Sequence, residues 1–562
     1  MALKSRDKHF RLPKISLLDY KTLEMDRVLT MLFARIHHKG EDSRLFKKDT
    51  KIETFEAHFL SQPDRFKDFD KYPDITRGWL ETHLLDLVNR GKAGKEAVAA
   101  PRPLHGYTYR FRNPSHCRDY GAAQHVYETL WHARNDLGKR AIAGMKAFFF
   151  EGVDPNTQQE DSSIMVDVET QALMSLNTAE VTQDAPLKDS RVPTPPLCIG
   201  SADLMADDLV RLLQYRKKIP RSVMVDYLKI LLAFHIALYH LRLLKLLPEL
   251  VKRKGTETIC HPANCPVKTA NGEKPQGACP YQIALFVDVQ NQPGTPVSQL
   301  AEISAELHYR RIPGLVRSHF LTKKLDEFAL HMLQSGRLQG GTNRQMSVGE
   351  VLRLLDDSYA TDREQFFGSR LMSLEEDTAI EDNSLDPEVQ AVKKLGLDHL
   401  NTYVECLMAL RGDYQRSFMV KSLDSLLLKN RPGALLAQQR SKNSPRRFIL
   451  DSRLLEVLLQ IAVLRFDSQS GRYFSEEIQI DRLLVFLRDR YGLYIDSLPE
   501  GEGFGEPSIA DCEAIRNNKV AFKNKLREIG FFQDLSDAYI TQHVTPRYRI
   551  NQQPAAPAGG TL

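Results

Sequence analysis

The sequence predicts a mainly α-helical, multidomain protein with a helical body, a small strand element beside a cysteine loop, and a C-terminal winged-helix-like domain. Three observations support this prediction. Apolar residues recur at helical spacing over most of the chain. Three of the seven cysteines fall within 20 residues rich in Pro, Gly and Asn, directly before the strand-like run YQIALFVDVQ. Near the end, two apolar helices precede a strongly basic one and a strand-like finish.

Changes in composition divide the 562 residues into six segments, and this length has room for about three or four domains. A polar, acidic and proline-rich stretch separates two helical regions and is typical of a linker. The last residues, NQQPAAPAGGTL, are expected to be disordered. The predicted segments are 1–150 (N-terminal helical domain), 151–200 (linker or long loop), 201–334 (central domain with the cysteine loop), 335–430 (helical scaffold), 431–550 (winged-helix-like domain) and 551–562 (disordered tail).

Composition bounds the class of protein. A hydrophobic content of 42% and a charged content of 27% are typical of soluble globular proteins. Seven scattered cysteines indicate a reducing compartment, and the N-terminus lacks an apolar run of signal-peptide length. We therefore expect a cytoplasmic protein. The net charge of +5 is small for this length, so any contact with nucleic acid must come from local basic clusters.

A long apolar helix is predicted after Pro220, a residue that suits a first helical turn. Residues 230–251 form an apolar run of 22 residues, which raises the question of a membrane span. Arg242, Lys245 and Glu249 lie inside this run, and each central charge would cost roughly 2.5–3.5 kcal/mol in a bilayer. We therefore expect a buried helix and no membrane partner. Pro248 is expected to end or kink this helix.

The cysteine loop, TICHPANCPVKTANGEKPQGACP, carries the sharpest chemical signal. Thiolates bind zinc at about 2.3 Å in a tetrahedral set, and a loop that supplies two or three ligands with a distant fourth is common. The loop therefore predicts a structural zinc held by Cys260, Cys265 and Cys279. Because C-x4-C-x13-C is not the usual C-x2-C pair, reduced cysteines, an iron–sulfur cluster or a disulfide stay open. The fourth ligand is also open, among His261, Cys198, His240, Cys117 and His116.

A basic helix near the C-terminus is the candidate DNA-binding element. Residues 515–527 contain no acidic side chain, and apolar residues on one side keep the basic side chains outward. Phosphate contacts would dominate the affinity for DNA and make it depend on salt. Winged helices also serve as protein-protein modules, so this alternative stays open. The predicted DNA-binding residues are Arg516, Lys519, Lys523, Lys525 and Arg527, and Asn517, Asn518 and Asn524 are placed to reach base edges.

Two other stretches allow weaker hypotheses. The run IMVDVET resembles the first metal-binding motif of DEDD-type exonucleases, in which Asp167 and Glu169 would bind a metal ion. The loop RPLHGYTYRFRNPSHCRDY has aromatic and basic residues that could stack on a nucleic-acid strand, although an edge strand is the favoured interpretation. There is no G-x-x-x-x-G-K-[ST], H-E-x-x-H or G-x-S-x-G motif in the sequence.

Two runs resemble a known group of proteins. They are ALFVDVQ…LAEISAELHYRRIPGLVRSHFLTKKLDEFAL in the central region and RLLVFLRDRYGLYID…RNNKVAFKNKLREIGFFQDLSDA near the end. Both are similar to large accessory proteins of bacterial phage-defence islands, in particular the methylation-associated defence system. The resemblance covers part of the chain and includes no catalytic motif. It implies a protein that works beside a methyltransferase, an ATPase or a nuclease encoded elsewhere, with other defence proteins as partners.

The leading hypothesis is a non-enzymatic accessory or scaffold subunit of a multiprotein antiviral defence system. It would contact DNA through the C-terminal domain and dock its partners on the helical body. The alternatives are a metal-dependent nuclease that uses Asp167 and Glu169, and a pure protein scaffold without affinity for DNA.

Overall fold

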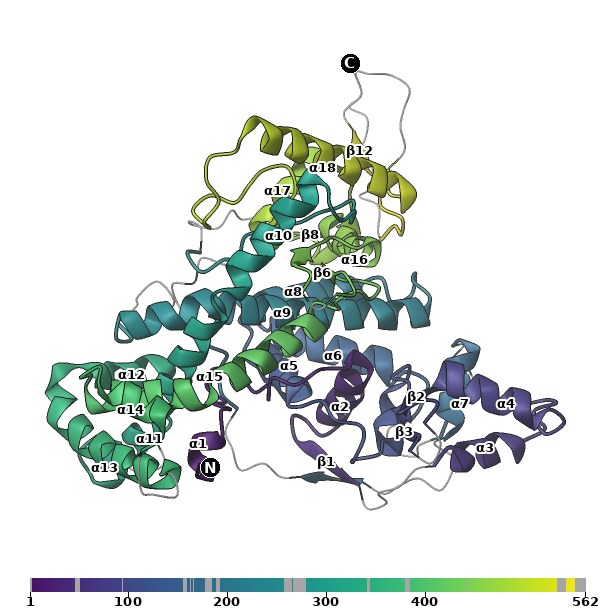
Figure 1. The fold of residues 1–562 in the computed structure, drawn as a ribbon. Helices are drawn as coiled ribbons and strands as arrows, with labels where there is room; N and C mark the ends of the chain where they lie inside the picture. Colours follow the sequence, from purple (N-terminus) through teal and green to yellow (C-terminus); the bar gives the residue numbers. More distant parts are fainter. Residues whose placement is uncertain are drawn as a thin grey trace.

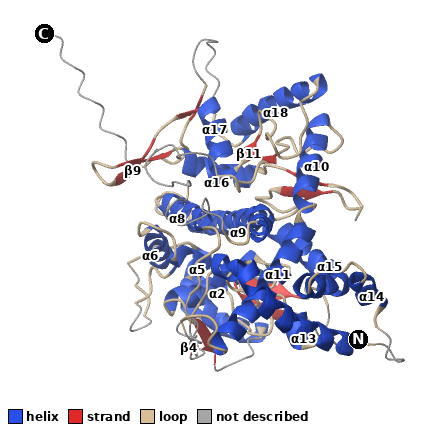
Figure 2. Cartoon of the chain, turned by 90° about the vertical axis from the view of Figure 1, so that its left-hand side faces the viewer, coloured by secondary structure: helices blue, strands red, loops and turns tan. Residues whose placement is uncertain are grey.

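Helices dominate the computed structural model, in which strands form only small sheets (Figures 1 and 2). The part of the chain that is described contains eighteen α-helices and six two-stranded sheets. One cluster of buried apolar side chains extends from Leu3 to Val544. The mainly α-helical class predicted from the sequence is therefore confirmed. The described residues are 3–45, 51–92, 95–154, 159–161, 163–164, 166–176, 184–187, 193–256, 265, 279–340, 344–379, 385–441, 443–532 and 542–550.

Helix α9 (Arg221–Lys252) lies across the middle of the molecule beside α8 (Ile199–Leu213) (Figure 1). Every residue from 230 to 244 is buried, because apolar side chains cover all sides of this part of the helix. Among the described residues, α9 alone is long and apolar enough to cross a membrane, and 94% of its most apolar 18-residue stretch is buried inside the protein. The prediction of a buried helix is confirmed.

Of the two outcomes expected at Pro248, an end or a kink, the structure excludes the end. The helix continues to Lys252, and the Arg253 amide still donates to the Glu249 carbonyl oxygen at 3.0 Å. A proline close to a helix end removes one intrahelical hydrogen bond and leaves the last turn intact. The turn follows at residues 253–255, and the φ of Gly255, +70°, lies in the left-handed region that favours glycine.

The N-terminal part packs against one side of α8 and α9. Helix α2 (Met25–His37) packs on α5 (Ala122–Trp131), and α6 (Leu137–Phe149) packs against both α5 and α8. Gly138, in the first turn of α6, permits the close approach of α6 to the end of α5, because a Cβ at this position would lie 1.6 Å from the Leu130 carbonyl oxygen. The remaining elements of this part are α1 (Ser5–Lys8), β1 (Asp42–Leu45), α3 (Ile52–Leu60), α4 (Pro73–Trp79), the π-helix η1 (Leu80–Leu84), β2 (Leu85–Val88), β3 (Ala97–Pro101), the 3-10 helix η2 (Gly106–Phe111), α7 (Val168–Ser175) and β4 (Asp184–Leu187).

A second helical group forms around α11 (Ile312–Gln334) and α15 (His399–Leu426), which pack along each other below α9 (Figure 1). A buried ion pair ties the N-terminus to this group. Lys324 of α11 lies 2.9 Å from the Asp7 carboxylate, and the Tyr403 hydroxyl of α15 donates to the same carboxylate. The other helices here are α12 (Val348–Leu352), η5 (Arg353–Leu355), η6 (Asp357–Tyr359), α13 (Ala360–Thr378) and α14 (Pro387–Lys393). Helix α10 (Pro296–Tyr309) precedes α11 in the chain but lies above α9, where it packs against β7 and α18 (Figure 1).

The segment 285–289 lies at the centre of the C-terminal part. It begins with β5 (Leu285–Phe286), which pairs in parallel with β11 (Leu493–Tyr494), and Asp288 forms a parallel bridge with Ile449. The strand predicted after the cysteine loop is therefore present, and its partners come from the last quarter of the chain. The other elements here are β6 (Leu436–Gln438), β7 (Arg446–Phe448), α16 (Ser452–Ala462), β8 (Leu464–Asp467), β9 (Arg472–Ser475), β10 (Ile478–Gln479), α17 (Ile480–Tyr491), α18 (Ile509–Glu528) and β12 (His543–Val544).

Short strands precede α17 and follow α18 in the sequence. The antiparallel hairpin β8–β9 follows α16, the first helix of this part, and β12 pairs with β10, the strand directly before α17. The predicted hairpin around Ser536 and Asp537, and the predicted tail 551–562, lie outside the described residues. The β10–β12 pairing therefore joins the chain before α17 to the chain after α18.

Buried charges join the C-terminal part to α8. Arg490 of α17 contacts both Asp207 and Asp208, with 2.7 Å between its Nη2 and Asp207 Oδ2. His235 Nε2 lies 3.0 Å from Asp208 Oδ2, and the Tyr491 hydroxyl donates to the same oxygen at 2.8 Å. The Asp208 side chain is fully buried, and each of its oxygens has a partner. Such a network is stable only while every charge keeps its counter-charge.

Candidate nucleic-acid interface

Helix α18 begins with a capping box. The Ser508 hydroxyl accepts a hydrogen bond from the Asp511 amide, and the Asp511 carboxylate accepts one from the Ser508 amide. These two contacts satisfy amides that have no partner inside the helix, and the acidic residue complements the positive end of the helix dipole. The basic residues follow after this first turn. Cap and charge order together account for a stable helix of 20 residues at this point.

Four of the five predicted DNA-binding side chains follow one face of α18. Arg516, Lys519, Lys523 and Arg527 are separated by three, four and four positions, a spacing that aligns side chains along a helix. Arg516 and Arg527 are exposed, and the two lysines between them are half-buried. The helix thus presents a basic stripe, by which we mean these four residues. A stripe of this kind can follow a row of phosphates.

Local contacts hold parts of the basic stripe in place. Lys519 pairs with Asp481 of α17 at 2.9 Å, and this hydrogen bond lowers the pKa of the Asp481 carboxyl. Lys523 lies near enough to lower the same pKa further, and it makes no ion pair within the described residues. Arg527 donates to the Asn524 side chain at 2.6 Å. Arg516 has no hydrogen bond or ion pair to another described residue, so its guanidinium faces solvent.

Lys525 is separate from the basic stripe. Its ammonium group donates to the Leu450 carbonyl oxygen at 2.9 Å, and burial lowers its pKa. Asp451 and Asp288 lie close enough to oppose that shift. Lys525 is two positions after Lys523, and side chains with this spacing point to opposite sides of a helix. The basic residues of α18 are therefore divided between two faces.

Asn518 performs a structural task. Its side-chain oxygen accepts from the Val289 amide at 3.0 Å, and its side-chain nitrogen donates to the carbonyl oxygens of Val287 and Ile495 at 2.9 and 3.0 Å. The residue is fully buried. The expectation that Asn518 reaches a base edge is therefore wrong, because α18 turns this side chain onto the central strand segment. Asn517 and Asn524 are exposed.

Apolar side chains share the outer face with the basic stripe. Ile509 is 90% exposed and Val520 is 55% exposed, although both are large aliphatic residues. Exposed Cys512 lies on the same side. The outer face of α18 is therefore mixed in character, with a positive row and isolated apolar residues. Single exposed apolar residues are common on protein surfaces and carry no function by themselves.

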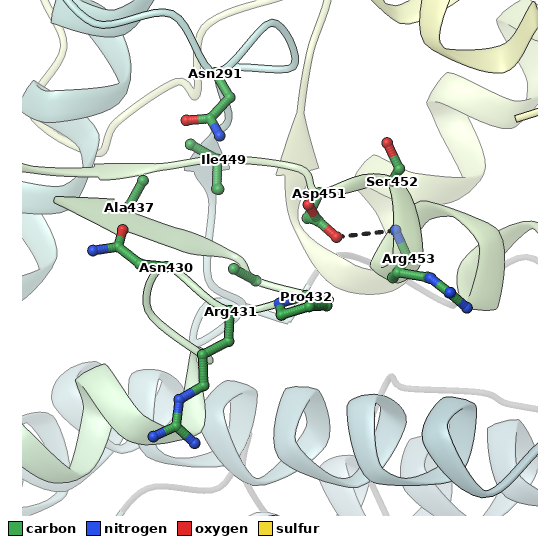
Figure 3. Close-up of a pocket in the computed structure, with 10 residues that line it drawn as sticks. Asn291, Asn430, Arg431, Pro432, Ala437, Ile449, Asp451, Ser452 and Arg453 are labelled. Carbon is green, nitrogen blue, oxygen red and sulfur yellow. Dashed lines mark hydrogen bonds between the residues drawn. The ribbon is translucent and has the colours of Figure 1, made fainter. Parts of the chain in front are cut away.

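A pocket of about 500 Å³ lies beside β6 and the start of α16 (Figure 3). It is lined by Asn291, by the turn that contains Asn430 and Arg431, and by the start of α16. Asp451 caps that helix, and its Oδ2 accepts from the amides of Gly433 and Arg453 at 2.8 and 3.0 Å. The segments that line the pocket lie about 140 residues apart in the chain, so no local sequence signal predicts the pocket.

The predicted metal ligands fall in different places. Cys260 lies outside the described residues, and Cys265 and Cys279 are half-buried. Over the described ranges, no group of three or more His, Cys, Asp and Glu side chains is arranged as a metal site. Cys198, one of the residues considered as a fourth ligand, lies with its Sγ 3.3 Å from Arg242 Nη1.

The carboxylates of the nuclease alternative belong to a helix start. Asp167 is the cap of α7, and its Oδ1 accepts from the Thr170 amide at 2.9 Å. Glu169 is half-buried in the first turn of that helix. The nuclease motif would follow a strand, whereas in this structure Asp167 caps the start of a helix.

The aromatic loop packs inside the protein. Tyr107, Tyr109 and Phe111 are buried in the 3-10 helix η2, and Arg112 donates to the carbonyl oxygen of Ser43. Both sequence-based interpretations, a stacking surface and an edge strand, are therefore wrong. Three aromatic rings within five residues supply a large apolar area, and here that area fills the core beside α2.

A helical protein with a basic helix and no recognised catalytic motif is the class that fold and sequence define. Comparison with protein families makes this specific: the family described as methylation-associated defense system protein MAD7 matches residues 5–548. The chain therefore belongs to this family, and the resemblance noted from two sequence runs is confirmed over nearly its whole length. No curated protein and no solved structure matches the chain.

Proposed function

We propose that this defence-system component is a non-enzymatic accessory subunit that contacts DNA through the basic stripe of α18. The remaining helices would form a framework on which other proteins of the system dock, in the cytoplasm. The proposal rests mainly on one observation, the alignment of Arg516, Lys519, Lys523 and Arg527 along one outer face of a helix. Phosphate oxygens are the ligands that such a row of cations fits.

The surroundings of α18 support this proposal. The inner side of the helix is fixed by Asn518, Phe522 and Leu526, all fully buried, so the outer side chains project from a rigid element. We further propose that residues 431–550 act in the manner of a winged-helix-like domain. In that arrangement α16 and α17 support α18, which is the helix presented to the duplex.

A DNA-binding measurement on the full-length chain tests the proposal. We expect the wild-type protein to bind a mixed-sequence duplex with an affinity that falls steeply between about 50 and 200 mM salt. In the variant Arg516→Glu/Lys523→Glu, binding should weaken at least about tenfold, and the slope of log affinity against log salt should fall by about two, because two phosphate contacts are lost. Fluorescence anisotropy at four salt concentrations measures both quantities.

The control reverses the same number of charges elsewhere. Arg416 and Lys421 are exposed on α15, and Figure 1 shows this helix below α9, whereas α18 lies above α9. The variant Arg416→Glu/Lys421→Glu should bind DNA almost as the wild type does. Equal binding by the α18 variant and the wild type contradicts the proposal. A wild-type chain that binds no DNA at low salt, yet co-purifies with other proteins of the system, favours the pure scaffold.

A further inference from the structure

An acidic side chain from the neighbouring helix contacts the basic stripe. Asp481 of α17 accepts a hydrogen bond through its Oδ1 from Lys519 Nζ, and the two atoms lie 2.9 Å apart. The Asp481 side chain is 81% exposed, and that of Lys519 is 35% exposed. The ion pair therefore lies at the surface, where a ligand of the stripe also has to approach.

A carboxylate and a phosphate are alternative partners for one lysine. Both are anions whose oxygens accept charge-assisted hydrogen bonds from an ammonium group. Lys523 is four positions after Lys519, so these two lysines are neighbours on one face of α18. An anion bound at Lys519 is therefore also close to the next cation of the stripe. The carboxylate of Asp481 thus lies where a phosphate of the DNA backbone would lie.

Asp481 also has a structural use at the start of α17. It is the acidic residue of the first turn, where a negative charge complements the positive end of the helix dipole. That use requires no contact with α18. The other aspartate of this helix, Asp489, is exposed as well, and its ion pair is with the adjacent Arg488 at 3.5 Å. The contact with the basic stripe therefore distinguishes Asp481 from an ordinary exposed acid on the same helix.

We propose that Asp481 occupies the position of a backbone phosphate on the basic stripe of the DNA-free protein, and thereby lowers the affinity of α18 for DNA. This inference rests on the proposed function of α18. On binding, the contact between Lys519 and Asp481 is exchanged for one between Lys519 and a phosphate, so only the difference between the two contacts contributes to affinity. The displaced carboxylate then stays close to the phosphate, and like charges at short range repel each other.

Binding of a mixed-sequence duplex by the full-length chain tests the inference, with fluorescence anisotropy as the measurement. Asp481→Asn should bind about two- to fivefold more tightly than the wild type at low salt, because an exposed ion pair changes an equilibrium by about this factor. The gain should shrink as salt is added, because salt screens exposed charges. The matched control is Asp489→Asn, which makes the same change in net charge on the same helix and should bind almost as the wild type does.

A double-mutant cycle shows whether the effect of Asp481 passes through Lys519. The gain in affinity from Asp481→Asn should be smaller when Lys519→Gln is also present, because the ion pair is then already absent. In the same way, Lys519→Gln should cost more affinity in the Asp481→Asn background than in the wild type. A general effect of net charge would instead give the same gain in both backgrounds and would contradict the inference.

The outcomes separate this inference from the proposed function. If the wild type binds DNA and Asp481→Asn binds no more tightly than Asp489→Asn, the inference fails and the proposed function of α18 stands. If neither the wild type nor Asp481→Asn binds DNA, both fail. Faster amide exchange at the start of α17 in Asp481→Asn, without tighter DNA binding, would leave Asp481 with its role at the helix dipole alone.

Discussion

Replacing Asp208 with asparagine is expected to loosen the contact between α8 and α17 by about 3–5 kcal/mol. Asp208 is completely buried and accepts hydrogen bonds from Tyr491, with His235 and Arg490 as its other partners. Asparagine keeps the shape but removes the negative charge, so the buried Arg490 guanidinium loses its main counter-charge. Asp207 alone would then have to balance Arg490 and Arg211.

Hydrogen–deuterium exchange measures this effect where it occurs. A loss of that size raises the opening equilibrium of α17 about 10²-fold or more, and its backbone amides should exchange correspondingly faster. The control is Asp489→Asn on the same helix, whose side chain is 62% exposed and whose ion pair with Arg488 spans 3.5 Å. In this control variant, the exchange of the α17 amides should stay nearly unchanged. Similar exchange in both variants would contradict a structural role for the network.

The same carboxylate predicts a dependence on pH. Burial raises the pKa of Asp208, but the Arg490 charge and the His235 hydrogen bond lower it more, to about 2. A depressed carboxyl pKa stabilises the folded state above the ordinary value of 3.8, and this contribution is lost as the pH falls through about 2. We therefore expect the difference in stability between wild type and Asp208→Asn to shrink between about pH 4 and pH 2. A constant difference over that range would contradict the assignment.

Replacing Asn518 with leucine is expected to destabilise the C-terminal part by about 3 kcal/mol or more. The change leaves three buried backbone groups without partners: the Val289 amide and the carbonyl oxygens of Val287 and Ile495. Each unsatisfied buried group costs about 1–3 kcal/mol. Because these groups belong to the central strand segment and to the chain after β11, one side chain holds α18 to both.

The amide of Val289 gives a direct readout of Asn518→Leu, since it loses its only described acceptor and should exchange much faster. The matched control is Asn517→Leu, the same substitution at the exposed neighbouring position, which should change stability by no more than about 0.5 kcal/mol. A variant with unchanged exchange and weakened DNA binding would instead return Asn518 to the role of a base-contacting residue.

Much of the helical architecture could be predicted from the sequence, and the candidate site only in part. The spacing of apolar residues predicted α9 and its burial, and the acid-free run predicted a basic α18. The sequence did not predict which residues of that run face inward, because Lys525 and Asn518 take their roles from contacts with Leu450 and with the segment 285–289. Hydrophobic periodicity shows which face of a helix is inward, but it does not identify the surface that meets that face.

The sequence by itself determined the helical class, the buried central helix, the family and the positive charge near the C-terminus, because these follow from composition and local spacing. The tertiary structure decided which side chains act together. It buried Tyr107 and Tyr109, placed Asp167 in a helix cap, and set Arg242 of α9 beside Cys198 at the start of α8. Contacts between distant segments depend on how helix faces pack against one another, and no local pattern of residues encodes that arrangement.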